Sequence, residues 1–201
     1  LPYLYFIKKL VASKYCMEEE NLIYKRINEK IEENNGFDEL VIFDIENVYG
    51  CNSIKTKNKK RKILKVNRAK KRLKNFDNYF NLTRNSLIII SANRRLLEDL
   101  DNWYFDESPP EEILISAKGK DGADLALIDT ADHILDSDLI SNFKEVVVAS
   151  GDHIFTPLVK KLIDKNVKYT TVSVHGCGLS SKLYENSDNH IILDQELEYV
   201  A

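Results

Sequence analysis

Three aspartates stand at points of the sequence where a parallel sheet would bring them together. Asp44 follows the apolar run 41–43, Asp152 follows the run 146–149, and Asp124 lies in the first turn of a predicted helix. In open parallel sheets, ligands bind in the crevice beyond the carboxyl ends of the strands. Carboxylates that meet there raise one another's pKa unless a hard cation lies between them. Ligands that are all oxygen predict Mg²⁺ or Mn²⁺.

Two further carboxylates flank Asp124 in the sequence. Asp121 is a predicted N-cap of the same helix and a candidate ligand. Asp129 lies five residues after Asp124, about 140° around the helix, so both can reach one ion only if the helix entry bends. The simpler interpretation of Asp44 alone is that it ends a strand and hydrogen-bonds a turn. The metal hypothesis therefore depends on the whole group.

A basic segment follows Asp44 in the chain. Residues 51–76 hold 12 of the 29 Lys and Arg residues and none of the 32 Asp and Glu residues. Such a run usually forms a solvated face, but here no acids neutralise it, which indicates binding to a polyanion. It begins at the sheet edge where Asp44 is expected. Phosphate contacts are predicted for Lys59, Lys60, Arg61, Lys62 and Arg68.

Short apolar runs alternate with helical stretches from residue 37 onward, which is typical of βαβ units. Strands are predicted at 40–44, 87–91, 113–116, 145–150, 169–174 and 190–193. Helices are predicted near 66–80, 93–102, 122–136, 157–165 and 180–186. Right-handed crossovers then give an α/β fold, a three-layer α/β/α sandwich with a mostly parallel sheet. Residues 1–36 are predicted to form an N-terminal helical arm that packs on the domain 37–201, on a second copy of the chain or on a regulatory protein.

Composition limits the class of protein. The chain has 201 residues, of which 43% are hydrophobic, enough for one domain with a real core. Cys16, Cys51 and Cys177 form no C-x-x-C pair, so neither a disulfide framework nor a zinc site is predicted, and a cytoplasmic location is expected. No apolar run reaches the roughly 20 residues of a membrane span. Residues 1–11 also lack the basic region and cleavage site of a signal peptide.

Four sequence features together carry a family resemblance. They are Asp44-Ile45-Glu46-Asn47, the helix start Asp124-Leu125-Ala126-Leu127, Ser150-Gly151-Asp152 with Phe155, Pro157 and Leu158, and Ser180-Ser181-x-Leu183 with Ser187-Asp188. Over residues 38–195 this ordered set resembles the NYN branch of the PIN-like metal-dependent ribonucleases. The resemblance implies an α/β/α fold and hydrolysis of RNA phosphodiester bonds with Mg²⁺ or Mn²⁺. By position, Asp44, Asp124 and Asp152 would be the metal-binding catalytic acids, and Asn47 a nearby polar contact.

Two positions depart from that pattern. Many members have a second Asp two residues after the strand-4 Asp, where this chain has Ile154, and the change puts a second metal in doubt. Many also have Lys three residues before the helix Asp, where this chain has Asp121. Either Lys118 or Lys120 replaces that charge, or Asp121 is itself a ligand.

The leading hypothesis is metal-assisted cleavage of single-stranded RNA with weak sequence preference. Ser150 and Ser180 belong to the resembling motifs and are candidate substrate contacts, and His153, next to Asp152, either contacts a phosphate or is a surface histidine. A second hypothesis, motivated by Ile154, is a non-catalytic RNA-binding module on the same fold. A third is a haloacid-dehalogenase-like phosphatase with Asp44 as nucleophile. That chemistry requires a second Asp two residues after the first, where this chain has Glu46.

Overall fold

Six strands form one parallel sheet in the order β3-β2-β1-β4-β5-β6. The computed structural model describes residues 17–49, 71, 74–76, 78–80, 82–83, 85–92, 111–116, 121–175 and 178–193. The strands are β1 (Phe37–Asp44), β2 (Ser86–Ala92), β3 (Glu111–Ser116), β4 (Phe143–Ala149), β5 (Tyr169–Val174) and β6 (His190–Leu193). The chain builds outward from β1 to β3 and then returns to β4 on the other side of β1. The strand order therefore reverses between β1 and β4, the point where open α/β sheets bind ligands.

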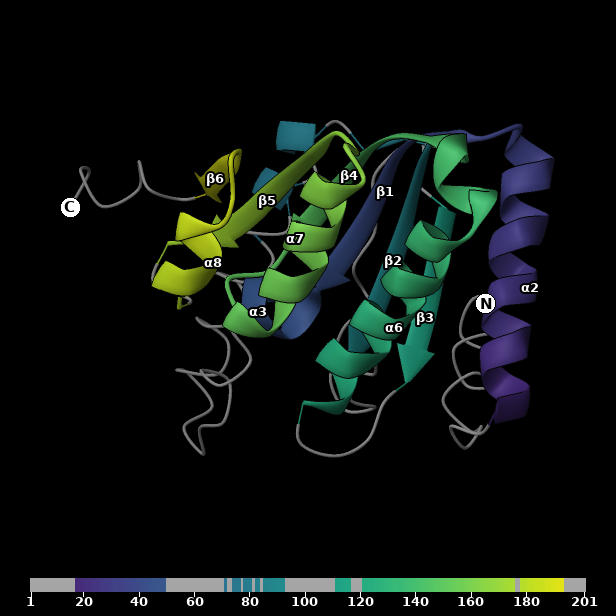
Figure 1. Ribbon diagram of the computed structural model, residues 1–201, viewed down its shortest axis with the longest axis horizontal. Helices are drawn as coiled ribbons and strands as arrows, with labels where there is room; N and C mark the ends of the chain where they lie inside the picture. Colours follow the sequence, from purple (N-terminus) through teal and green to yellow (C-terminus); the bar gives the residue numbers. More distant parts are fainter. Residues whose placement is uncertain are drawn as a thin grey trace.

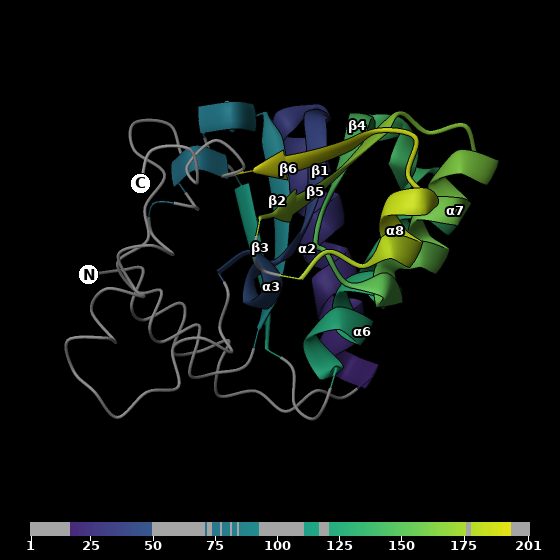
Figure 2. The same cartoon turned by 90° about the vertical axis from the view of Figure 1, so that its left-hand side faces the viewer.

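Helices cover both faces of this sheet. They are α2 (Met17–Asn34), α3 (Ile45–Tyr49), α6 (Gly122–Asp136), α7 (Thr156–Asp164) and α8 (Ser181–Glu185), with 3-10 turns at Asp138–Asn142 and His153–Phe155. α6, α7 and α8 lie on one face, and α3 lies on the other together with the described helical residues of 71–80 (Figures 1 and 2). The prediction of an α/β/α sandwich with a parallel sheet is confirmed.

The central strands are apolar throughout because both of their faces are covered. In β1, Leu40 and Ile42 pack toward α6 and α7, whereas Val41 and Phe43 pack toward the opposite layer. The ring of Phe43 lies 4.9 Å from that of Phe76, which belongs to the helical residues on that side. Two hydrophobic clusters, one on each face, thus hold the sheet between its helices.

The arm helix α2 packs on the domain at the β3 edge of the sheet (Figure 1). Ile27 and Ile31, four residues apart on one side of the helix, are buried in the same hydrophobic cluster as the α6 face. The ring of Tyr24 stacks on that of His133 in α6, with 3.6 Å between the ring centroids. The helix ends before Gly36, whose φ of 94° is one that glycine adopts without strain. Residues 1–16 of the predicted arm lie outside the described residues.

The strand predictions at 169–174 and 190–193 match β5 and β6, and the other four strands are found within three residues of their predicted bounds. The helix predicted at 122–136 matches α6. The helix predicted near 93–102 and most of that near 66–80 lie outside the described residues. α3 has no counterpart among the predictions, because its sequence Ile-Glu-Asn-Val-Tyr is rich in residues that favour strands.

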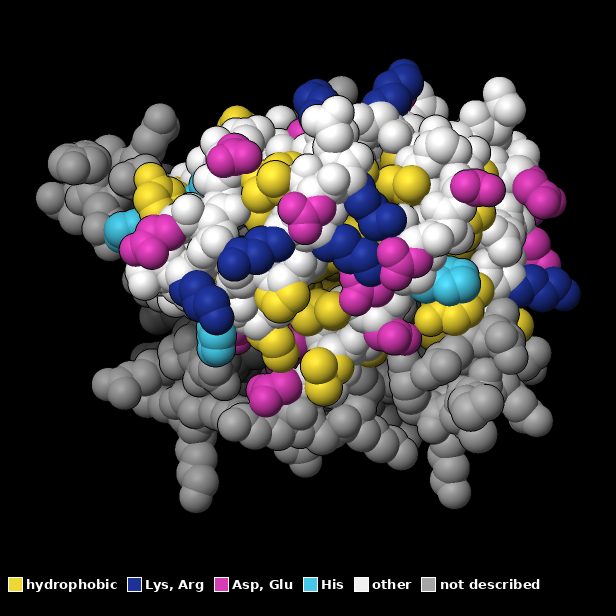
Figure 3. Space-filling model, viewed as in Figure 1, with side chains coloured by type: hydrophobic (Ala, Val, Ile, Leu, Met, Phe, Trp, Pro, Cys, Tyr) yellow, Lys and Arg dark blue, Asp and Glu magenta, His cyan; other side chains and the backbone are white. Residues whose placement is uncertain are grey.

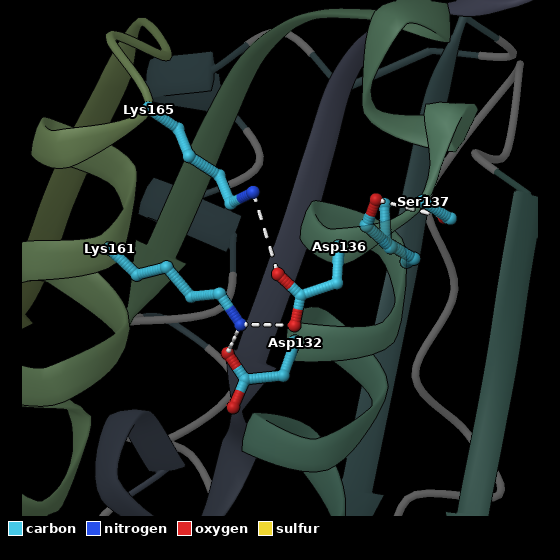
Figure 4. Close-up of polar contacts among 6 residues, drawn as sticks. Asp132, Asp136, Ser137, Lys161 and Lys165 are labelled. Atoms are coloured by element: carbon cyan, nitrogen blue, oxygen red, sulfur yellow. Dashed lines mark hydrogen bonds and ion pairs between the residues drawn. The ribbon is translucent and has the colours of Figure 1, made fainter.

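Lys161 of α7 joins that helix to α6 through two carboxylates (Figure 4). Its Nζ lies 2.9 Å from Asp132 Oδ1 and 2.6 Å from Asp136 Oδ2. Lys165 Nζ adds a contact of 3.4 Å to the other oxygen of Asp136. The hydrogen bond from Lys161 holds the pKa of Asp136 below its ordinary value. These contacts keep α6 and α7 side by side.

We expect Lys161→Ala to lower the melting temperature by about 2–4 °C, because a network of ion pairs contributes more than an isolated surface pair. Lys144→Ala is the matched control. The side chain of Lys144 pairs with Asp38 and is 80% exposed, against 27% for Lys161. Thermal unfolding followed by circular dichroism would show the difference. Equal shifts in the two variants would contradict a special role for the α6–α7 network.

Candidate active site

The candidate site lies where β1 and β4 end. Figure 1 shows that the N-terminal ends of α6 and α7 lie at this same end of the sheet. Asp44 is the last residue of β1, Ser150 to Asp152 directly follow β4, and Asp124 is in the first turn of α6. The strand reversal thus gathers polar groups from three separate parts of the chain.

Asp44 is held rigidly at this point. Its side chain is only 3% exposed. Oδ2 accepts a hydrogen bond of 2.7 Å from Ser150 Oγ, and Oδ1 accepts one of 3.0 Å from the backbone N–H of Asn47. Ser150 Oγ in turn accepts a hydrogen bond of 3.1 Å from the backbone N–H of Asp152. These bonds tie the end of β1 to the segment that follows β4.

The carboxylates of the site repel one another. Burial raises the pKa of Asp44 to about 6, although the hydrogen bonds from Ser150 and Asn47 favour its ionised form. The pKa of Asp124 rises to about 7, and the largest cause is that the side chain is partly buried. The negative charges of four other carboxylates add to that rise: Asp44, Asp152, Glu46 and Asp121. Four predicted metal ligands therefore lie near enough for their charges to act on one another at Asp124, and the structure adds Glu46 to them.

Asp121 occupies the predicted N-cap position of α6, and its backbone carbonyl accepts the N–H of Leu125 at 3.0 Å. Its side chain does not make the expected capping hydrogen bond, because the residue takes a left-handed conformation with φ of 57°. The carboxylate acts instead on the pKa of Asp124.

Gly151 permits a close approach of two segments at the site. Its backbone N–H donates to Asn47 Oδ1 at 3.0 Å, and its carbonyl accepts from the backbone N–H of Ser180 at 2.8 Å. A Cβ atom at this position would lie 2.3 Å from the carbonyl oxygen of Gly178. A residue with a side chain would therefore force the backbone segments apart. Asn47 and Ser180, both predicted substrate contacts, are positioned through Gly151.

Asp152 and its neighbours form a short turn leading into α7. Asp152 Oδ1 accepts from the backbone N–H of Ile154 at 3.1 Å and lies 2.9 Å from Nδ1 of His153. The His153 side chain is 68% exposed, so it is accessible to a ligand at the site. Ile154 packs against the hydrophobic cluster beneath α6 and α7. Its apolar side chain is therefore used by the core.

The donor set suits a hard divalent cation that keeps part of its water shell. The carboxylates supply only oxygen ligands, and the repulsion around Asp124 would fall on binding a cation. In the described part of the chain, no three His, Cys, Asp or Glu side chains lie close enough together to hold one ion directly. Mg²⁺ commonly binds one or two carboxylates and retains several waters. The site fits that mode of binding.

Other predicted site residues are placed elsewhere or are not described. Asp129 Oδ2 accepts a hydrogen bond of 3.2 Å from the hydroxyl of Tyr24 in α2, on a side of α6 away from the Asp124 group. Of the basic segment, Lys71 and Lys74 are described, and both are exposed. Figure 3 shows Lys and acidic side chains interspersed over α6 and α7. The predicted contacts outside the described residues are Lys59, Lys60, Arg61, Lys62, Arg68, Lys118 and Lys120.

No helix among the described residues is long and apolar enough to cross a membrane.

No model of a known protein family matches the chain, and no curated protein matches it. Among solved structures, the chain is similar to a protein of unknown function from Vibrio parahaemolyticus, with a TM-score of 0.46 and 17% sequence identity. That match covers 80% of this chain and 95% of the other.

Proposed function

We propose that this protein is a metal-dependent ribonuclease that hydrolyses phosphodiester bonds of single-stranded RNA in the cytoplasm. The observation that carries the proposal is the environment of Asp124. This partly buried carboxylate has a pKa raised by four other carboxylates at the point where the strand order reverses. That repulsion would fall if the carboxylates held a divalent cation, which would supply positive charge to accept a phosphate. The resemblance of the surrounding motifs to the NYN ribonucleases agrees with this chemistry.

Each residue of the site has a role in the proposed reaction. A bound Mg²⁺ or Mn²⁺ would activate water and offset the negative charge that develops on the phosphate. Asp44, Asp124 and Asp152 would hold the ion, no more than two of them directly and the rest through its water shell. Ser150 and the backbone of Asn47 keep the Asp44 carboxylate oriented before substrate arrives. Such preorganisation is what makes electrostatic stabilisation effective, because no reorganisation is needed during the reaction.

The basic segment 51–76 and the exposed His153 support the choice of substrate. Phosphate contacts by Lys and Arg position a nucleic acid without reading its sequence. The proposed enzyme therefore has weak sequence preference, and its affinity for RNA falls steeply as salt concentration rises.

The test is cleavage of a labelled single-stranded RNA with Mn²⁺. We expect Asp44→Asn to reduce the rate at least 100-fold while the circular dichroism spectrum is unchanged, because the amide removes one charged ligand and keeps the shape. Asp164→Asn, the same chemical change at an exposed residue near the end of α7, should cleave at the wild-type rate. Unchanged cleavage by Asp44→Asn would refute the assignment.

A second candidate function is RNA binding without cleavage. Ile154 packs against the core, and no group of three direct ligands is present in the described residues. Tight RNA binding with no cleavage in either Mg²⁺ or Mn²⁺ would favour this function. The phosphatase hypothesis is less favoured, because both oxygens of Asp44 accept hydrogen bonds and the side chain is buried. A phosphate ester trapped covalently on Asp44 would revive it.

A further inference from the structure

Ser91 carries a buried hydroxyl that no other described residue satisfies. Its side chain is 1% exposed, and its Oγ has no hydrogen-bond partner among the described residues. Leaving a buried polar group unpaired costs roughly 1–3 kcal/mol, so each such group calls for a physical explanation. A structural role in the strand alone would be served as well by alanine.

The position of Ser91 ties it to the candidate site. It pairs in register with Asp44 on the neighbouring strand, so both side chains point to the same face of the sheet. That face is the one covered by α6, because Leu87 and Ile89, two and four residues earlier in β2, belong to the hydrophobic cluster on the α6 side. α6 packs on β1 and β2, and its first turn carries Asp124. Ser91 therefore lies at the inner wall of the site, on the opposite side of Asp44 from Ser150.

Other hydroxyls on this face have hydrogen-bond partners. Ser150 donates to Asp44 at 2.7 Å, and Thr130 in α6 donates to the carbonyl of Ala126 at 2.7 Å. The hydroxyl of Ser173 in β5 lies 2.9 Å from Nε2 of His190. Asp44 does not accept a direct hydrogen bond from Ser91, although its oxygens, which accept from Ser150 and Asn47, keep further acceptor sites.

We propose that Ser91 is a positioning residue of this site, whose hydroxyl binds a water molecule that also contacts the carboxylates of Asp44 and Asp124. The inference rests on the proposed function and names one more residue that serves the cation. A hydroxyl can donate one hydrogen bond and accept two, and carboxylates accept, so one water can join the three groups. Buried waters in proteins typically make about three such bonds.

The consequence is a specific effect on cation binding. A divalent ion that has few direct protein ligands depends on ordered waters for the rest of its shell. Residues that orient those ligands typically contribute about 10–100-fold to metal affinity. Replacing Ser91 by Ala should therefore weaken Mn²⁺ binding by about 10-fold or more. It should not lower the melting temperature of the metal-free protein, because the hydroxyl makes no hydrogen bond to another described group of the protein.

The experiment measures the Kd of Mn²⁺ by water-proton relaxation, together with metal-free melting temperature, for four proteins. They are the wild type, Ser91→Ala, Ser91→Thr, which keeps the hydroxyl, and Thr156→Val. Thr156 is the matched control, because its buried Oγ1 also lacks a partner among the described residues and it lies at the start of α7. We expect weaker Mn²⁺ binding only in Ser91→Ala. If Ser91→Ala does not fold, Ser91→Cys is measured in place of Ser91→Ala.

The outcomes separate this inference from the proposed function. If the wild type binds Mn²⁺ and Ser91→Ala binds it equally well, Ser91 is not a positioning residue and the proposed function stands. Equal weakening in Ser91→Ala and Thr156→Val would also overturn the inference, since it would point to a general packing effect. If the wild type does not bind Mn²⁺, the proposed function and the inference both fail.

Discussion

Replacing Asp44 by Asn is expected to raise the free energy of unfolding by about 2 kcal/mol at pH 8 without divalent cations. Folding raises the pKa of Asp44 from 3.8 to about 6, mainly because the side chain is buried. That difference corresponds to roughly 3 kcal/mol of destabilisation once the group is ionised. Part of the gain is lost in the variant, since an amide accepts weaker hydrogen bonds than a carboxylate from Ser150 and Asn47.

The sign of the pH dependence follows from proton binding. Between pH 3.8 and about 6 the folded state binds more protons at Asp44 than the unfolded state, so stability falls as pH rises. Asp124, with a pKa of about 7, extends the same trend to higher pH. Below pH 3.8 both groups are protonated in both states and contribute nothing. The free energies of unfolding of Asp44→Asn and the wild type should therefore be nearly equal at pH 4. Their difference should grow as pH rises and level off above pH 7.

Urea unfolding at pH 4, 6 and 8 in the presence of a chelator would measure this difference. The exposed variant Asp164→Asn should match the wild type at each pH. Adding Mn²⁺ at pH 8 should make the wild type more stable than Asp44→Asn, because an ion that binds only the folded wild type stabilises it. A variant less stable than the wild type at pH 8 without metal would show that the ionised Asp44 carboxylate stabilises the fold, and it would contradict the destabilisation expected from its burial.

Gly151→Ala should destabilise the fold by about 3 kcal/mol and remove RNA cleavage. The added Cβ would lie 2.3 Å from the carbonyl oxygen of Gly178, so one backbone segment must move. Movement would break the hydrogen bonds that Gly151 makes to Asn47 and Ser180, and each of these contributes about 1 kcal/mol. Asn47 and Ser180 would then lose the positions that Gly151 gives them at the site.

Gly178→Ala is the matched control for this change. Gly178 has φ of 89°, but no atom of the described residues beyond its chain neighbours lies within 4 Å of its ideal Cβ position, so alanine there meets backbone strain without a clash with them. We expect it to cost about 1 kcal/mol and to keep most of the cleavage activity. Chemical denaturation and RNA cleavage would be measured for both variants. If the two variants lost equal amounts of stability and cleavage activity, general strain in the loop, rather than the close approach at Gly151, would control the site.

The sequence predicted the positions that follow directly from strand ends. Asp44 and Asp152 lie after short apolar runs, and a parallel sheet must bring such ends to one edge. Asp124 was predictable from the helix start. By contrast, α3 was not predictable from local preference, because its β-branched residues form a turn that the hydrogen bond from Asn47 to Asp44 stabilises.

Contacts between elements were the least predictable part of the site. Asp129 could be assigned to a helix but not to a partner, and its contact with Tyr24 depends on how α2 packs against α6. Ser91 ends a predicted strand, yet its proposed role follows from its register with Asp44 and from the lack of a hydrogen-bond partner among the described residues. Single-residue register in a sheet is set by long-range pairing, which a local pattern does not contain.

The strand order also determines when during synthesis the site can form. Ser150 and Asp44 are 106 residues apart in sequence, yet one hydrogen bond joins them across the central strand pair. Such a long-range contact forms only after the intervening chain has folded back, which is slow relative to local contacts. A nascent chain that has emerged as far as β3 therefore carries Asp44 without Ser150 or Asp152. A nuclease built on this order would be inactive on the ribosome until β4 had been made and had paired with β1.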